Sequence, residues 1–259
     1  MNAFSYIKDA TTGVTFSIAN DRTQGCASLA DGSLEVMIQR RLLHDDGRGV
    51  GEPLNETGID GKGLIIRTLH RVSLAASAVA GAAARRTAVA DLMYRPVVAY
   101  SPLGGATPAA WVAAHAANFT GIARPLPPSL HLLTAHSWGP TSLLLRISHS
   151  FEANEAGSLS APASVDLATI FAGVTITACT EMTISGNQPL ANVPKTTYAV
   201  QGGGPSSTLP IVPPAPAGAS LTVTLTAMQI RTFMCTTDAQ SAAGESIAAA
   251  PWTRGAGSA

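Results

Sequence analysis

The sequence predicts a mainly β protein, an antiparallel β-sandwich with one alanine-rich helix and long loops. Apolar and polar side chains alternate along several short segments, and this period of two places one set of side chains on a buried sheet face. Turn residues separate the segments, and short strands spaced in this way are typical of a sandwich. With 259 residues, 46% of them hydrophobic, the chain can bury a core of that kind.

The expected strands follow from this alternation and from runs of β-branched residues. Leu34, Val36 and Ile38 share one side of the first strand, because successive side chains of a strand point to opposite faces. Residues 129–135 and 142–149 form an expected hairpin, since a Gly-Pro pair lies between them. The full set of expected strands is 34–39, 64–72, 129–135, 142–149, 174–184 and 221–233.

The remaining segments are expected to be one helix and several loops. Residues 75–93 form the helix, because alanine has the highest helix propensity, and Pro96 ends it. Prolines predict a loop over 101–128, with a short helical turn around 109–117, and a flexible excursion over 202–216. We expect one β region at 1–237, alternatively with a smaller β subdomain at 205–237, and a disordered tail at 238–259.

Charge and hydropathy exclude two classes of partner. Sixteen Lys and Arg balance sixteen Asp and Glu, so the electrostatic footprint of a nucleic-acid or anionic-membrane binder is missing. The most apolar stretch, 74–90, contains Gly81, Arg85 and Arg86 and falls short of the ~20 apolar residues of a membrane span. The amino terminus has no secretory signal pattern. We therefore expect no nucleic acid, no membrane and no signal peptide for this chain.

The cysteines and the sequons give weaker signals. Cys26, Cys179 and Cys235 are too few and too scattered for a disulfide framework, and we expect them to be buried free thiols. Asn55-Glu-Thr and Asn118-Phe-Thr are N-glycosylation sequons, and they matter only in a lumenal parent protein.

The residue patterns of catalysis and metal binding are missing. A retaining glycosidase needs two carboxyl groups about 5 Å apart, but Asp45 and Asp46 are adjacent, and neighbours on a strand point to opposite faces. No Cys or His spacing suggests zinc. We therefore expect no catalytic residue, no metal ligand and no cofactor in this chain. The histidines, in unrelated segments, stand at positions 44, 70, 115, 131, 136 and 149.

A series of sequence blocks carries the strongest functional signal, because several blocks in order are more specific than any one of them. They read DRTQG at 21–25, DGSLE at 31–35, RRLLHDDGRGVGEPLNE at 40–56, LPPSLHLLT at 126–134, SWGP at 137–140, LSAP at 159–162 and MQIRTF at 228–233. Together they closely resemble the lysosomal-type α-mannosidases of glycoside hydrolase family 38.

The resemblance implies a fold, an activity and a location. It implies that the chain is the galactose-mutarotase-like C-terminal β region of such an enzyme, whose zinc and aspartate nucleophile lie in a catalytic domain outside this chain. The parent would hydrolyse terminal α-linked mannose of glycans in the lysosome, vacuole or secretory lumen. We expect this chain to be inactive alone, with that catalytic domain and a mannose-containing glycan as partners.

The resemblance also implies a candidate site, because the C-terminal half of such enzymes supplies an arginine to the rim of the sugar pocket. Arg48, which lies between two glycines, is the first candidate and Arg41 the second. We expect Arg40, Asp45 and Asp46 to share this rim or interdomain contact. Alternatively, the aspartates cap loop amides while the arginines form ion pairs that brace the turn. An exposed apolar patch beside residues 40–51 would indicate an interface.

Two other functions stay open. Trp138 can stack on a sugar ring, but core packing at the hairpin is the interpretation we favour. A stand-alone carbohydrate-binding sandwich would use exposed aromatics, and only 5% of the residues are aromatic. An inert truncated fragment is the other alternative.

Overall fold

The computed structural model describes residues 1–49, 51–115, 117–193, 201–202 and 221–238, and this part of the chain is mainly β. It falls into two compact units: Met1–Val98 with Asn154–Gly157, and Ala99–Ala153 with Ser158–Ala259. The expected tail at 238–259 and excursion at 202–216 lie almost wholly outside the described residues. The expected bounds of the β region, 1–237, and of its subdomain, 205–237, stay predictions.

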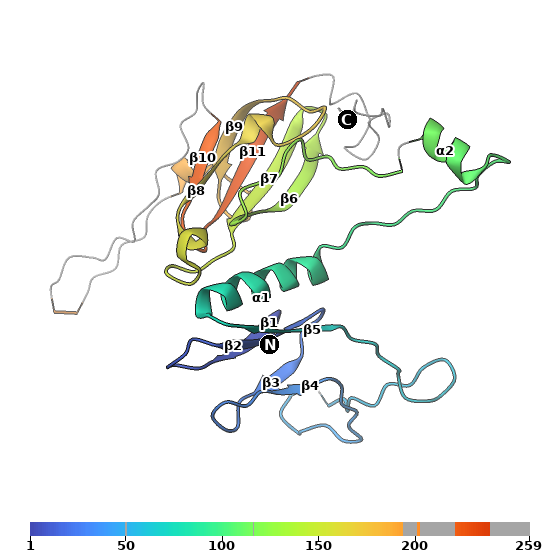
Figure 1. Ribbon diagram of the computed structural model, residues 1–259, viewed down its shortest axis with the longest axis vertical. Coiled ribbons are helices and arrows are strands. Elements are labelled where there is room, and N and C mark those ends of the chain that lie inside the picture. The colour runs from blue at the N-terminus through green and yellow to red at the C-terminus, as the bar shows by residue number, and fades with distance from the viewer. Residues whose placement is uncertain (50, 116, 194–200, 203–220, 239–259) are drawn as a thin grey trace. The chain divides into compact units, whose positions relative to one another are not determined.

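The first unit is an antiparallel sheet covered on one face by a helix (Figure 1). Helix α1 packs mainly on β2, the central strand. Its core is formed by Ala19, Ala88 and Leu92, with Phe4 and Val89 against them. The elements are β1 (Phe4–Lys8), β2 (Thr15–Asn20), β5 (His70–Ala75) and α1 (Ala78–Met93), with sheet order β1-β2-β5, and a separate pair of strands, β3 (Gly25–Ala27) and β4 (Glu35–Met37).

Helix α1 confirms the expected alanine-rich helix, and its position depends on one glycine. Ser77 caps its first turn by accepting a hydrogen bond from the amide of Ala80 at 3.2 Å. A Cβ atom at Gly81 would lie 2.7 Å from the Cβ of Thr15 on β2. The helix therefore lies so close to the sheet that only glycine fits at position 81.

Buried charges also hold the first unit together. Arg85 and Arg86 both pair with Glu155, Arg86 through its Nη2 at 3.0 Å. The guanidinium of Arg85 lies 4.1 Å from the ring centroid of Tyr6, which adds a cation–π contact. These contacts hold residues 154–157 within this unit.

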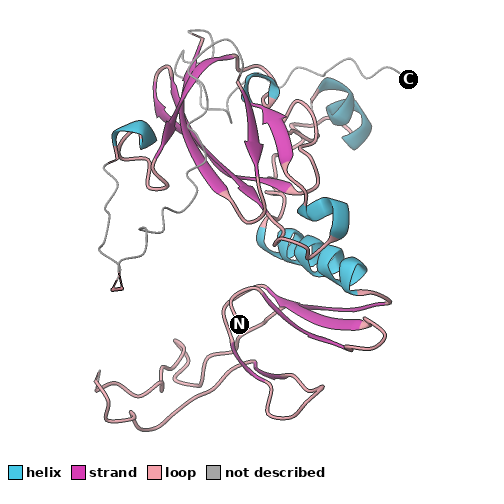
Figure 2. Cartoon of the chain, turned by 90° about the vertical axis from the view of Figure 1, so that its left-hand side faces the viewer, coloured by secondary structure: helices cyan, strands magenta, loops and turns pink. Residues whose placement is uncertain are grey.

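The second unit is a small sandwich of two antiparallel sheets around one core, which confirms the predicted fold class (Figure 2). Leu145, Ile147 and Phe233 of the larger sheet pack with Val223 and Leu225 of the smaller one. The larger sheet has the order β6 (Leu130–Gly139), β7 (Ser142–His149), β11 (Ile230–Thr237), β9 (Ile176–Met182), and the smaller pairs β10 (Thr222–Leu225) with β8 (Ala163–Asp166).

Short helices complete the regular structure of the described residues. Helix α2 (Pro108–Ala114) lies where a helical turn was expected. Its first turn is capped by Thr107, which accepts from the amide of Ala110 at 3.2 Å. The 3-10 helices are η1 (Gly157–Ser160), η2 (Leu167–Thr169) and η3 (Leu190–Asn192).

Three strand predictions need correction. The expected strand at 34–39 is only the short β4, and most of the expected strand at 64–72 is loop up to His70. The segment 221–233 is two strands, β10 and β11, rather than one. A turn separates them, in which Met228 has a positive φ of 58° and the Gln229 side chain accepts from the amide of Thr226 at 3.0 Å.

The prediction of free thiols is wrong for two of the three cysteines. Cys179 on β9 and Cys235 on β11 are directly opposite each other in the sheet and form a disulfide. Their Cα atoms are 4.0 Å apart, because antiparallel pairing places such residues side by side. Cys26 is free, as expected, but it is only half-buried.

Candidate functional site

The predicted site residues lie in one exposed loop of the first unit, residues 40–49, here called the arginine loop. The carboxylate of Asp45 accepts the amide of Gly47, and that of Asp46 accepts the amide of Arg48 at 3.0 Å. Gly47 has a positive φ of 66°, a conformation that favours glycine. The two aspartates therefore shape the turn that carries Arg48, as the bracing interpretation predicts for them.

The arginines do not brace the loop by ion pairs within the described residues. Arg41 donates from Nε to Oδ1 of Asn55 at 2.6 Å, and the amide of Leu42 donates to the carbonyl of Leu54 at 2.9 Å. These contacts close the base of the loop without a carboxylate partner for Arg41 among the described residues. The guanidinium groups of Arg40 and Arg48 extend from an exposed backbone and are available to an external carboxylate or hydroxyl.

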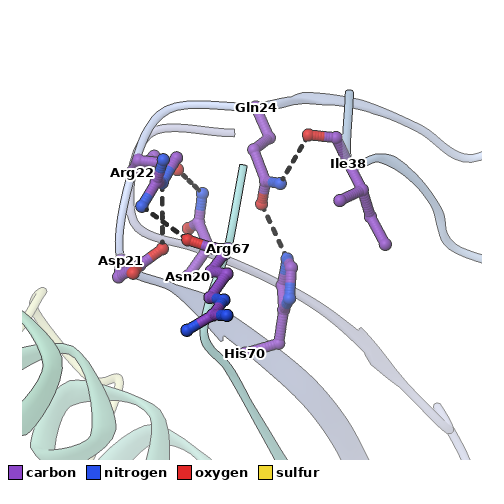
Figure 3. A network of polar contacts seen from close by, with 7 residues as sticks. All are labelled: Asn20, Asp21, Arg22, Gln24, Ile38, Arg67 and His70. Atoms are coloured by element: carbon purple, nitrogen blue, oxygen red, sulfur yellow. Dashed lines mark hydrogen bonds and ion pairs between the residues drawn. The ribbon is translucent and has the colours of Figure 1, made fainter. Parts of the chain in front are cut away.

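A buried glutamine fixes the segment that leads into the arginine loop (Figure 3). Gln24, 7% exposed, donates from Nε2 to the carbonyl of Ile38 at 3.3 Å, and its Oε1 lies 2.7 Å from Nε2 of His70. One residue further on, Gln39 donates to the carbonyl of Leu64 at 3.0 Å. The side chains of Gln24 and Gln39 thus fix where the loop begins, and His70 of β5 holds Gln24 in place.

The neighbouring residues of the DRTQG block form a polar corner in the same network (Figure 3). Arg22 donates to the carbonyl of Arg67 at 2.8 Å and pairs with Asp21 at 3.3 Å, while the fully buried Asn20 donates to the carbonyl of Arg22. Hydrogen bonding from the backbone of Leu69, and then the contact with Arg22, lower the pKa of the Asp21 carboxyl. Sequence reasoning did not foresee this role, because two of the partners, Arg67 and Leu69, are 45 or more residues away in the chain.

The surface beside the arginine loop is rich in exposed apolar side chains, as an interface requires. Ile59 and Ile65 are essentially fully exposed, and Leu43, inside the loop, is 69% exposed. Exposed apolar groups in such number mark interaction sites on soluble proteins. This apolar surface consists of Met37, Ile38, Leu42, Leu43, Leu54, Ile59, Leu64, Ile65, Ile66 and Leu69.

The two sequons have different surroundings. Asn55 is half-buried and accepts the hydrogen bond from Arg41, whereas Asn118 lies in an exposed loop after α2. A glycan on Asn55 would have to coexist with that hydrogen bond. Glycosylation at both positions stays a prediction.

Trp138 is 60% exposed, so the interpretation that it packs into the core is wrong. The hairpin core is instead filled by Leu143, Leu145 and Ile147 of β7. Within the described residues, no three His, Cys, Asp or Glu side chains gather closely enough to hold a metal ion. Helices long and apolar enough to cross a membrane are likewise not found in the described part of the chain.

Comparison with known proteins agrees with the resemblance found in the sequence blocks. The family described as "Glycosyl hydrolases family 38 C-terminal domain" matches residues 1–48. The chain is 40% identical to the lysosomal alpha-mannosidases of Bos taurus and Homo sapiens, and 32% identical to that of Dictyostelium discoideum, over at least 90% of its length. It spans only 22–24% of the length of these relatives. The chain therefore belongs to glycoside hydrolase family 38, as part of the C-terminal β-domain region of lysosomal-type α-mannosidases.

Proposed function

We propose that this chain is a non-catalytic part of an α-mannosidase that removes terminal α-linked mannose from glycans, and that it packs on the catalytic domain and completes it. The observation that carries the proposal is the arginine loop, which is ordered by its own aspartates yet presents arginines and apolar side chains outward. A loop fixed in this way can contact a partner with little loss of entropy.

Arg48 is the arginine we assign to the rim of the sugar pocket, with Arg41 as the second candidate. The backbone amide of Arg48 donates to the carboxylate of Asp46. This hydrogen bond fixes the turn, so the Arg48 side chain starts from a defined position. Arg41 is already used by Asn55, and this favours a role in supporting the loop. A guanidinium at the rim donates to sugar hydroxyls or to a carboxylate.

The zinc ion of the parent enzyme would be held by the catalytic domain, as the resemblance to the family implies. The Cys179–Cys235 disulfide supports a lumenal location for the parent, since disulfides persist in oxidising compartments. An oxidising compartment agrees with a lysosomal or vacuolar parent enzyme.

The interface is tested by titrating this chain against the separately produced catalytic portion of a related α-mannosidase and measuring association by calorimetry. Leu43→Asp should weaken association at least about tenfold, because it places a charge in the apolar surface. Leu29→Asp is the matched control: Leu29 is 80% exposed but lies in the β3–β4 turn, outside the arginine loop. Equal affinities for the two variants would refute the proposed interface.

The assignment of Arg48 is tested on the associated pair. Arg48→Ala should raise KM for an α-mannoside or lower kcat/KM while association stays intact, and Arg124→Ala, at an exposed arginine of the second unit, should change neither. Loss of activity in Arg41→Ala with normal kinetics in Arg48→Ala would reassign the rim to Arg41.

A further inference from the structure

The larger sheet of the second unit has an outer face that carries an exposed aromatic pair. His136 on β6 is directly opposite Leu144 on β7, so the two side chains share one face. Leu144 is buried but does not belong to the core cluster, which contains its neighbours Leu143 and Leu145. His136 and Leu144 therefore mark the face of the sheet that points away from the core.

Trp138 extends this outer face beyond His136. The two rings meet edge to face, with centroids 5.9 Å apart and an interplanar angle of 77°. The strand is irregular between Ser137 and Gly139, and bulges of this kind redirect side chains near binding sites. Although tryptophan is normally among the more buried residues, Trp138 is 60% exposed, so its indole is accessible to a ligand.

A polar turn lies on the same face. A Cβ at Gly186 would be 3.3 Å from Cδ1 of Leu144, so the 183–187 turn passes over the residue that neighbours His136. Arg146, also on β7, fixes the turn by donating to the carbonyls of Ile184 and Ser185 at 3.0 and 3.1 Å. Strand β7 thus connects the two features: its Leu144 is opposite His136 of β6, and its Arg146 holds the turn.

The side chains of this turn offer hydrogen-bonding groups. Thr183 and Ser185 both donate to Oδ1 of Asn187, at 2.6 and 2.8 Å. This orients the Asn187 amide, so that its NH2 group points away from the two hydroxyls. Ser185 and Asn187 are exposed and Thr183 is half-buried, so the Ser185 hydroxyl and the Asn187 amide nitrogen can be reached from solvent.

We propose that Trp138 and His136, with the 183–187 turn, bind a pyranose ring of a mannose-type glycan. A pyranose has an apolar C–H face, which stacks on an indole, and a rim of hydroxyls, which pair with hydroxyl and amide groups. One flat aromatic surface beside a polar turn fits a sugar ring better than a protein partner, which would need a wider apolar core. The choice of mannose rests on the proposed function, while the site itself is separate from the arginine loop.

The site is tested by calorimetric titration of the full chain with an α-linked mannotriose. Trp138→Ala should weaken binding about tenfold or more, Asn187→Ala should weaken it less, and Trp138→Tyr should keep most of the affinity because it keeps a ring. Trp111→Ala is the matched control and should leave binding unchanged, since Trp111 of α2 is stacked on His115, the residue that follows the helix, at a centroid distance of 4.5 Å.

Several results would overturn the site. Failure of the unsubstituted chain to bind mannotriose would do so, as would equal affinities of Trp138→Ala and Trp111→Ala. If Trp138→Ala instead weakens association with the catalytic portion, Trp138 belongs to a protein interface. Arg48→Ala should still bind mannotriose normally, so failure of this site and failure of the proposed function are distinguishable.

Discussion

Arg231 shows how a single buried charge organises the second unit. Its Nε and Nη2 donate to the two carboxylate oxygens of Glu181 at 2.8 and 2.6 Å, and its Nη1 donates to the carbonyl of Thr224 at 2.9 Å. Since both partners of the ion pair are about 95% buried, the guanidinium links β9, β10 and β11 away from water. The MQIRTF block, which carries part of the family resemblance, thus has a structural role here.

Glu181→Gln should lower the free energy of unfolding by about 3–5 kcal/mol, because it leaves the Arg231 charge buried without its counter-ion. Urea denaturation followed by circular dichroism measures this. Asp91→Asn is the control: it breaks the Arg71–Asp91 pair, whose side chains are about half exposed, and should cost less than about 1 kcal/mol. Similar losses in the two variants would contradict the account.

His131 predicts a pH dependence of stability. Burial lowers the pKa of His131 below its usual value of 6.5. The folded state therefore binds fewer protons than the unfolded state, so the stability that His131 contributes is present above about pH 6.5 and is lost as the pH falls through the folded-state pKa. Urea denaturation at about pH 7 and about pH 5 should show a smaller loss of stability on acidification in His131→Gln than in the unsubstituted chain. Equal losses in the two proteins would argue against this effect.

At the scale of elements, the disulfide joins the edge strand β9 to β11. It closes a loop of 56 residues, and cross-linking a loop of that size stabilises a fold by about 2–4 kcal/mol. Cys179→Ser combined with Cys235→Ser should therefore lower the free energy of unfolding by that amount. Cys26→Ser, at the half-buried free thiol, is the control with a small expected effect. A reductant that leaves the unfolding curve unchanged would contradict this prediction.

At Gly81 in α1, a glycine-to-alanine substitution should destabilise the fold, although such substitutions usually stabilise a helix. Replacing glycine by alanine inside a helix usually stabilises by about 1 kcal/mol, but a Cβ at position 81 would clash with Thr15 at 2.7 Å. Gly81→Ala should therefore lower the thermal midpoint of unfolding. Thr87→Ala, at an exposed position of the same helix, should leave it unchanged or raise it slightly. A stabilised Gly81→Ala variant would show that α1 can move away from β2.

The sequence predicted the elements whose apolar side faces a core, and it missed those that depart from this pattern. The β6–β7 hairpin and α1 follow directly from alternation and alanine propensity. Strand β2 does not, because its side under α1 carries Thr15 and Ser17, both nearly fully buried, so polar residues stand on the covered side of the pattern. The disulfide was missed because strand register, not sequence spacing, places Cys179 opposite Cys235.

At the scale of the whole molecule, the candidate site was predictable in outline only. Its exposure, its glycine-flanked Arg48 and the aspartate caps follow from turn chemistry near residues 45–49. The support comes from Gln24, which is 14 residues from Ile38 and 46 residues from His70 in the sequence, and such tertiary contacts leave no local pattern. Trp138 was placed wrongly in the core because the sequence around a hairpin turn does not distinguish a buried aromatic side chain from an exposed one.

The central claim is that this chain completes an α-mannosidase without carrying out the chemistry. Its most direct test is hydrolysis of a chromogenic α-mannoside at acidic pH with zinc, measured for the chain alone, for a separately produced catalytic portion of a related enzyme, and for their mixture. We expect no hydrolysis by the chain alone and a higher rate in the mixture than with the catalytic portion alone. Hydrolysis by the chain alone, or a mixture no more active than the catalytic portion, would contradict the account.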